Sequence, residues 1–198
     1  MLSTEERNAR ILATLKQTMP HVTNFTHDIG LPTQPVGHSS GIMTSTSGED
    51  EMDHVIQAIC QRWPQLIVEK QEVVVRFRDP VEVAITGEMK QVINAMLPSN
   101  PCYEAILDRY HTVDPTTGHR IPIIEAACAS KFAALVSPYR EWERKQQDAV
   151  DLRSIMVPNH ATLDRRLLQL LGDLVYPDGG KELLEYLQLA IDKKPFPV

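Results

Sequence analysis

The sequence predicts an α+β protein, with a mixed α/β lobe in residues 1–100 and a mainly helical lobe in residues 101–198. Two observations support this fold class. In the first lobe, short stretches of alternating or β-branched residues stand between helical patterns. From residue 125 almost to the end, apolar residues recur at helical spacing. The sequence has no internal repeat and no clear linker, so one lobe is expected to lead directly into the other.

The chain is expected to begin with a helix and a strand. Residues 3–6 fit a helix-capping box, and apolar residues follow at helical spacing as far as Pro20. Residues 25–31 then alternate between apolar and polar side chains, which is typical of a short strand. Residues 32–48 are rich in Pro, Gly, Ser and Thr, so a long loop is expected there.

Further helices and strands are predicted in order along the rest of the chain. Acidic residues in the first turn and a single apolar face indicate a helix over residues 48–63. β-Branched runs predict strands at residues 73–77 and 81–85, and a helix is expected around residues 88–97. A further helix is predicted to begin near Tyr103, followed by short strands joined by a turn within residues 112–123. The rest of the chain is predicted to form helices at residues 125–136, 139–156, 161–175 and 180–192.

Composition and charge narrow the classes of function. Twenty Lys and Arg against 26 Asp and Glu give a formal net charge of −6. That balance argues against broad coating of a nucleic-acid backbone, but it is compatible with a local basic groove or a pocket for a small acidic ligand. No stretch approaches the roughly 20 apolar residues that a membrane span needs, and no apolar run follows the N-terminal charges. We therefore predict a cytoplasmic protein that does not associate with a membrane.

The cysteines give no sign of a disulfide or zinc site. Cys60, Cys102 and Cys128 are odd in number and widely spaced, and they include no Cys-x-x-Cys pair. We expect them to be buried as small apolar residues.

Residues 24–30 contain a His-Asp pair that has two interpretations. As a His-Asp motif, His27 and Asp28 would be metal ligands of an HD phosphohydrolase, which gathers such ligands on helices. As Thr-x-Asp-Ile, the same stretch would be a strand that presents Asp28. The alternating pattern and the nearby Pro32 favour the strand. Residues 37–41 match the Gly-x-Ser-x-Gly motif of α/β-hydrolases, but neither flank is a buried strand or a helix, so we interpret them as part of a loop.

The most informative residues lie on two consecutive predicted helices. Lys131 follows Ala127 by one turn on a helix rich in small residues, where an ammonium group can be held close to a phosphate. The next helix carries Arg144 and then Asp148 and Asp151, whose carboxylates stand one turn apart on one face. Taken alone, these residues favour a structural interpretation, in which an ion pair from Lys131 to either carboxylate holds the two helices together.

The order of these residues resembles the C-terminal motifs of nucleotidyltransferase-fold proteins of the abortive-infection toxin type. That family typically has Leu-x-x-x-Lys-x-x-Ala, which residues 127–134 match with Ala127 in place of the leucine. It also has an Arg followed by Lys-Asp and a further Asp, which residues 144–152 match with Gln147 in place of the lysine. The resemblance covers residues 118–152 well.

The resemblance implies that the first lobe is nucleotidyltransferase-like and that the protein binds a nucleoside triphosphate with Mg²⁺. Asp28 and Glu82 match the carboxylates that hold the metal on strands of that lobe. Lys131 would contact a phosphate, and Arg144 would help to build the nucleotide pocket. A nucleotide would be transferred to a protein or RNA acceptor, and a further partner protein is compatible with this role. The catalytic residues that the resemblance implies are Asp28, Lys131, Asp148 and Asp151, the last two positioning Lys131 or the acceptor.

Two departures from the family pattern leave a second function open. Gly30 stands where the common Thr-x-Asp-Ile-Asp motif has its second acid, and no Gly-Gly or Gly-Ser turn precedes Asp28. Losing one of two paired carboxylates weakens metal binding, so the chain could instead be a non-catalytic binding or regulatory module of the same fold. A rival alignment starts from Ser39 and uses Glu51 and Asp53 as the metal-binding pair, but these acids open a predicted helix.

Overall fold

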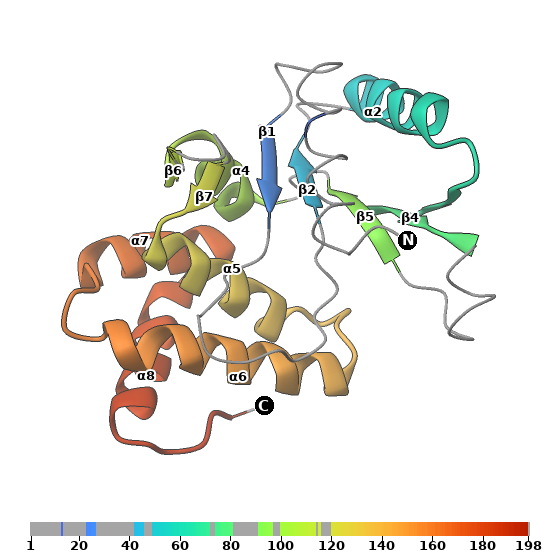
Figure 1. Ribbon diagram of the computed structural model, residues 1–198. Helices are drawn as coiled ribbons and strands as arrows, with labels where there is room; N and C mark the ends of the chain where they lie inside the picture. Colours follow the sequence, from blue (N-terminus) through green and yellow to red (C-terminus); the bar gives the residue numbers. More distant parts are fainter. Residues whose placement is uncertain are drawn as a thin grey trace. The chain divides into compact units, whose positions relative to one another are not determined.

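The computed structural model describes residues 13, 23–26, 42–45, 49–71, 74–80, 91–96, 100–113, 115 and 120–197 (Figure 1). The chain divides into two compact units, of which the first comprises Met1–Ser99 and Val113–Ile121. The second unit comprises Asn100–Thr112 and Pro122–Val198. The described residues form both strands and helices, with the longest run of helices after residue 123, so the predicted α+β class is confirmed.

The strands within the described residues form a mixed sheet in the order β3-β4-β5-β2-β1-β7-β6. β3, β4 and β5 are antiparallel neighbours, β2 runs parallel to β5 and antiparallel to β1, and β1 runs parallel to β7. In register, Phe25 of β1 is paired with Met43 of β2 and with Arg120 of β7. The strands are β1 (Thr23–Thr26), β2 (Ile42–Ser45), β3 (Ile67–Lys70), β4 (Val74–Arg78), β5 (Gln91–Met96), β6 (His111–Val113) and β7 (Arg120–Pro122).

Helix α2 (Glu49–Arg62) covers part of this sheet in the first unit. Its buried apolar residues recur at the spacing of one helical face. They pack with two fully buried residues of the sheet, Phe77 in β4 and Ala95 in β5. α2 thus confirms the helix predicted over residues 48–63. The buried cluster consists of Met52, Val55, Ile59, Val75, Phe77 and Ala95.

Local sequence patterns failed at three strands of the sheet. The helix predicted around residues 88–97 is wrong, because Gln91–Met96 forms β5. β5 lies between β4 and β2 and pairs with both, and these non-local hydrogen bonds override its local helical pattern. β2 falls within the stretch predicted as a loop, residues 32–48, and β3 was likewise missed.

Other predictions for the first half are confirmed or fall outside the described residues. β1 confirms the start of the strand predicted over residues 25–31, since it covers Thr23–Thr26. Residues 27–31 and the strand predicted at residues 81–85 lie outside the described ranges, as does the helix predicted near the N-terminus apart from the helical residue 13. β4, β6 and β7 confirm the remaining predicted strands.

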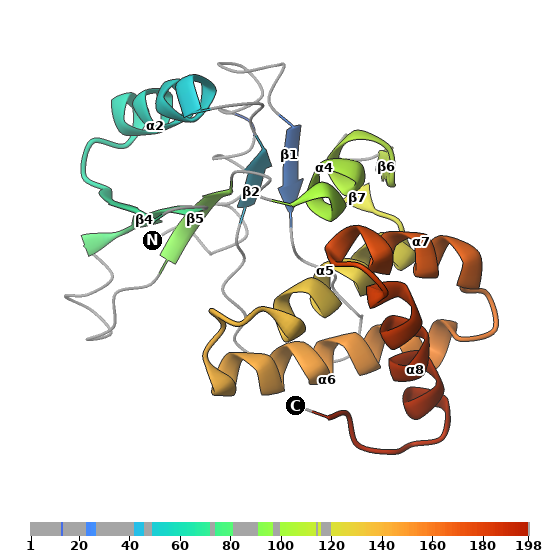
Figure 2. The same cartoon turned by 180° about the vertical axis from the view of Figure 1, so that it is seen from behind.

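The second unit is a helical bundle (Figure 2). α5 packs against α4, α6 and α7, and α8 packs against α6 and α7. The small residues from Ala126 to Ala129 are at most 3% exposed, so α5 is buried on more than one side. The helices predicted after residue 125 and near Tyr103 are confirmed, although α6 lies slightly C-terminal to residues 139–156. The bundle contains α4 (Pro101–Asp108), α5 (Ile124–Val136), α6 (Trp142–Asn159), α7 (Arg165–Val175) and α8 (Gly179–Ile191).

Side-chain caps fix where two of these helices begin. Oδ1 of Asn100 accepts hydrogen bonds at 2.9 and 3.2 Å from the first backbone N–H groups of α4. Oδ1 of Asp164 does the same for α7 at 2.9 and 3.1 Å. The backbone N–H of Asp164 donates in turn to Glu125 of α5 at 2.9 Å, which joins the start of α7 to α5. These bonds satisfy N–H groups that have no partner within their own helix.

The buried thiols of the second unit should make the protein sensitive to alkali. Burial raises the pKa of the Cys102 thiol from 9.0 to about 12, and burial, helped by the Glu125 carboxylate, raises the pKa of Cys128 to about 12. The fold favours the neutral thiols, so their contribution to stability is complete below about pH 9 and is lost as the pH rises towards about 12. Urea unfolding between about pH 7 and about pH 11 should therefore show a falling free energy of unfolding.

A variant without these thiols provides the control. Cys102→Ala combined with Cys128→Ala should lose less of its free energy of unfolding over the same alkaline range. An equal loss would contradict the assignment to the thiols. In the folded protein at neutral pH, we expect the half-buried Cys60 to react with a thiol reagent before either buried cysteine.

Candidate functional site

Lys131 lies on α5 at a point where the neighbouring residues of the helix are small. Ala127, one turn before it, is buried, and Ala134, three residues after it, is half-buried. The Lys131 side chain itself is only 15% exposed. Its hydrocarbon stem is therefore largely shielded, while its ammonium group reaches side chains of the next helix, α6.

Two carboxylates of α6 hold the ammonium group of Lys131. Its Nζ atom lies 2.6 Å from Oδ2 of Asp151 and 3.4 Å from Oδ1 of Asp148. The other oxygen of Asp151 accepts a hydrogen bond from Nε2 of Gln147 at 2.8 Å. The predicted proximity of Lys131 to the two aspartates is confirmed. Both the functional and the structural interpretations require this contact.

Asp148 also holds a second cation, which the sequence patterns did not reveal. Nε and Nη2 of Arg140 lie 2.9 and 2.8 Å from Oδ2 of Asp148. Arg140 precedes α6 in the loop after α5, so no helical spacing links it to its partner. Arg144, the arginine selected from the sequence, is exposed, and its side chain takes part in none of the hydrogen bonds or ion pairs found among the described residues, so its role stays a prediction. We refer to Lys131, Arg140, Asp148 and Asp151 as the charged cluster.

Within the charged cluster, Asp148 is buried and Arg140 is exposed to solvent. Asp148 is 3% exposed and is the only buried charged residue in the part of the chain that the structure describes. The Asp151 side chain is 26% exposed, and that of Arg140 is 41% exposed. A buried carboxylate is tolerated when it is paired and hydrogen-bonded, and each oxygen of Asp148 faces one cation. The cluster thus combines a neutralised buried anion with an accessible cation.

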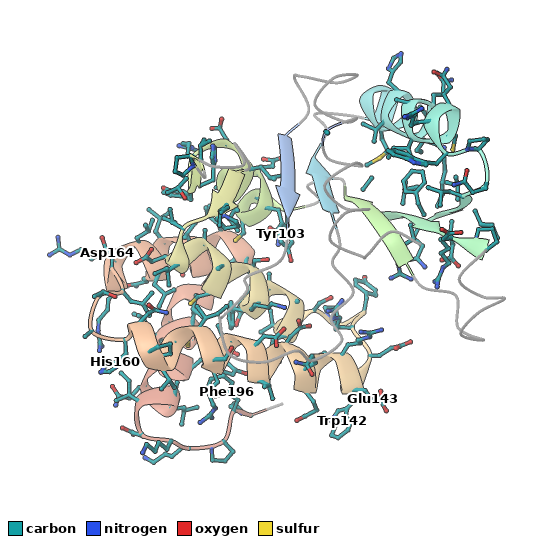
Figure 3. The ribbon with its side chains drawn as sticks, viewed as in Figure 1. Tyr103, Trp142, Glu143, His160, Asp164 and Phe196 are labelled. Carbon is teal, nitrogen blue, oxygen red and sulfur yellow. The ribbon has the colours of Figure 1, made fainter. Side chains whose placement is uncertain are left out.

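Tyr103 of α4, labelled in Figure 3, places a phenol against α5, the helix that carries Lys131. Its hydroxyl donates to the backbone carbonyl of Ser130, the residue before Lys131, at 3.5 Å. Burial is the main cause that raises the pKa of Tyr103 to about 12; Cys102 and, least, Asp148 also raise it, while the hydrogen bond to Ser130 and the charge of Arg140 lower it. The phenol is therefore protonated at neutral pH, and it tethers α4 to the turn of α5 that carries Lys131. Sequence reasoning did not select Tyr103.

The predicted metal ligands Asp28 and Glu82 lie outside the described residues, so their placement stays a prediction. Asp53, from the rival alignment, is on α2 and pairs with the exposed Lys70 at 2.8 Å. Within the ranges that the structure describes, no three His, Cys, Asp or Glu side chains are grouped so that they could hold a metal ion.

Comparison with known proteins gives no family for this chain. No protein-family model matches the sequence, and no curated protein matches it. Among the described residues, none of the helices has both the length and the apolar character needed to span a bilayer. The function has to be inferred from the charged cluster and from the motifs that contain it.

Proposed function

We propose that the chain is a nucleotidyltransferase-like protein that binds a nucleoside triphosphate with Mg²⁺ and transfers a nucleotide to a protein or RNA acceptor. The contact of Lys131 with Asp148 and Asp151 carries this proposal, because it brings together the two stretches that resemble the family. The mixed sheet adds support. β1 ends at Thr26, two residues before Asp28, so the proposed metal ligand follows a strand.

Lys131 would bind a phosphate of the nucleotide. An ammonium group has three donors, and the two aspartates accept from two of them, which leaves one N–H for a ligand. Asp148 and Asp151 fix the position of the ammonium and are therefore positioning residues in this proposal. Arg144 would line the nucleotide pocket.

Asp28 and Glu82 would hold Mg²⁺. The carboxylates of the charged cluster do not fit this task, because each already pairs with Lys131 or Arg140, whereas Mg²⁺ requires oxygen ligands that are free to face it. When bound, the ion neutralises charge on the triphosphate and activates the incoming hydroxyl group.

A binding or regulatory module without catalysis is the second candidate, and Gly30 favours it. Gly30 stands in place of the second acid of the metal pair, so Mg²⁺ would be bound more weakly than in a complete site. The HD phosphohydrolase alternative requires a helix around His27 and Asp28. β1 is a strand that ends directly before His27, which favours the nucleotidyltransferase interpretation of this stretch.

Thermal melts with Mg²⁺ and each common nucleoside triphosphate test the proposal. We expect at least one nucleotide to raise the free energy of unfolding by about 2.7 kcal/mol when present at about 100 times its dissociation constant. Asp28→Asn should abolish the part of this gain that depends on Mg²⁺. Asp53→Asn is the matched control, because it makes the same chemical change at an acid that pairs with Lys70.

The possible results separate the candidates. Stabilisation that is lost in Asp28→Asn, together with transfer of labelled nucleotide to an acceptor, would support the enzyme. Stabilisation without transfer would support the binding module. If the Mg²⁺-dependent stabilisation were lost in Asp53→Asn but kept in Asp28→Asn, the metal site would be the one that the rival alignment predicts. If no nucleotide stabilised the protein, nucleotide binding would be excluded for both candidates.

A further inference from the structure

Arg140 has more hydrogen-bond donors than the protein uses. A guanidinium group carries five N–H donors. Among the described residues, the only hydrogen bonds and ion pairs of the Arg140 guanidinium group are those of Nε and Nη2 with Oδ2 of Asp148. Five donors less these two leave three, including both on Nη1. Arg140 can therefore bind another anion without releasing Asp148.

The Arg140 side chain is also accessible to solvent within the second unit. The Arg140 side chain is 41% exposed, whereas that of its partner Asp148 is 4% exposed. Tyr139, directly before Arg140 in the loop, is 95% exposed. A ligand in solution can therefore reach the N–H groups that Asp148 does not use.

Asp148 brings Arg140 and Lys131 to the same place. Oδ2 of Asp148 faces Arg140, and Oδ1 faces Lys131. Because both oxygens belong to one carboxylate, the two cations lie within ion-pair reach of a single group. A guanidinium can bind phosphate oxygens in a bidentate manner, while an ammonium acts as a compact point charge. Together they suit an anion with several phosphate oxygens.

We propose that Arg140 is a phosphate-binding residue and that, with Lys131, it forms a two-cation site for the phosphate chain of the ligand. This inference rests on the proposed function and adds to it a residue that lies outside the predicted motifs. It also names the recognised group as an oligophosphate, which can engage both cations at once. The competing explanation is that Arg140 acts only as a structural partner of Asp148.

Titration calorimetry of the whole chain with inorganic tripolyphosphate and Mg²⁺ tests this inference. The variants are Arg140→Gln, which removes the charge, and Arg140→Lys, which keeps the charge but not the planar group. Arg165→Gln, at an exposed arginine of α7, is the control with the same change in charge. We expect the dissociation constant to rise about tenfold or more in Arg140→Gln, less in Arg140→Lys, and to be nearly unchanged in the control.

Two further readouts exclude a purely structural effect. All titrations are made well below the lowest melting temperature of the variants, so that unfolding does not contribute. The dissociation constant is also followed against salt concentration. Arg140→Gln should show a weaker salt dependence than the unmodified protein, because one cation fewer contacts the ligand.

The outcomes distinguish this inference from the proposed function. In one outcome, Lys131→Met loses tripolyphosphate binding, while Arg140→Gln keeps it and only melts at a lower temperature. Arg140 would then be a structural residue and the inference would be wrong, but the proposed function would stand. If the unmodified protein binds neither tripolyphosphate nor any nucleoside triphosphate, both fail. The two-cation site is supported if tripolyphosphate binds more weakly to both Lys131→Met and Arg140→Gln, and if the dissociation constant of each variant depends less on salt than that of the unmodified protein.

Discussion

Replacing Lys131 with methionine should lower the free energy of unfolding by about 3 kcal/mol, which is the lower end of the range for breaking a buried ion pair. Methionine keeps most of the apolar stem, so packing changes little. The loss arises because Oδ1 of the buried Asp148 is left without a cation, and only Arg140 still neutralises that carboxylate. Urea unfolding followed by circular dichroism would measure the change.

A second substitution distinguishes this mechanism from a general defect. Adding Asp148→Asn to Lys131→Met should recover at least half of the loss, because no buried charge is then left unpaired. Lys181→Met, at an exposed lysine of α8, should change the free energy of unfolding by no more than about 0.5 kcal/mol. A loss below about 1 kcal/mol for Lys131→Met alone would show that Arg140 compensates Asp148 without help.

The charged cluster is an ion-pair network and, in our proposal, also a phosphate site, so its effects on stability and on binding have to be measured separately. As an ion-pair network, it joins α5 to α6. As a candidate phosphate site, it offers unused donors on Lys131 and Arg140. Substitutions in the cluster change both stability and binding, so binding has to be measured under conditions where each variant is folded. Only a change in the dissociation constant of the folded protein bears on function.

The sequence was most informative where structure depends on nearby residues. Lys131 and its aspartate partners lie on consecutive helices joined by a short loop, so helical spacing alone placed the three side chains near one another. The helices of the second unit were predicted for the same reason, since their apolar residues recur every three or four positions.

The sequence was least informative where the conformation depends on distant partners. Residues 91–96 became a strand because they pair with Met43 and Thr44 of β2 and with β4, and no local pattern specifies those partners. Arg140 was missed for a related reason. Its bond to Asp148 depends on how the loop before α6 is folded, and spacing rules for a helix do not extend into that loop.

Adding one methyl group to Gly180 should destabilise the protein by about 3 kcal/mol, the upper end of the usual cost of overpacking. The reason is the close contact of α7 with α8. A Cβ atom on Gly180 would overlap the backbone carbonyl oxygen of Gln169 and lie 2.8 Å from Oδ1 of Asp173. The same oxygen of Asp173 accepts a hydrogen bond from the Gly180 N–H at 2.9 Å. Backbone atoms cannot move aside as the end of a flexible side chain can, so the two helices would have to separate.

The sign of the effect makes this prediction discriminating. In a helix without such contacts, changing glycine to alanine stabilises the helix by about 1 kcal/mol. The loss of stability expected for Gly180→Ala therefore has the opposite sign. Gly172→Ala provides a second test from the facing helix, where the added Cβ would lie 2.6 Å from the Cα atom of Gly180. Gln169→Ala, at an exposed position of α7, is the control and should change the free energy of unfolding by no more than about 0.5 kcal/mol. Urea unfolding that finds Gly180→Ala as stable as the unmodified protein would mean that α7 and α8 are not in backbone contact.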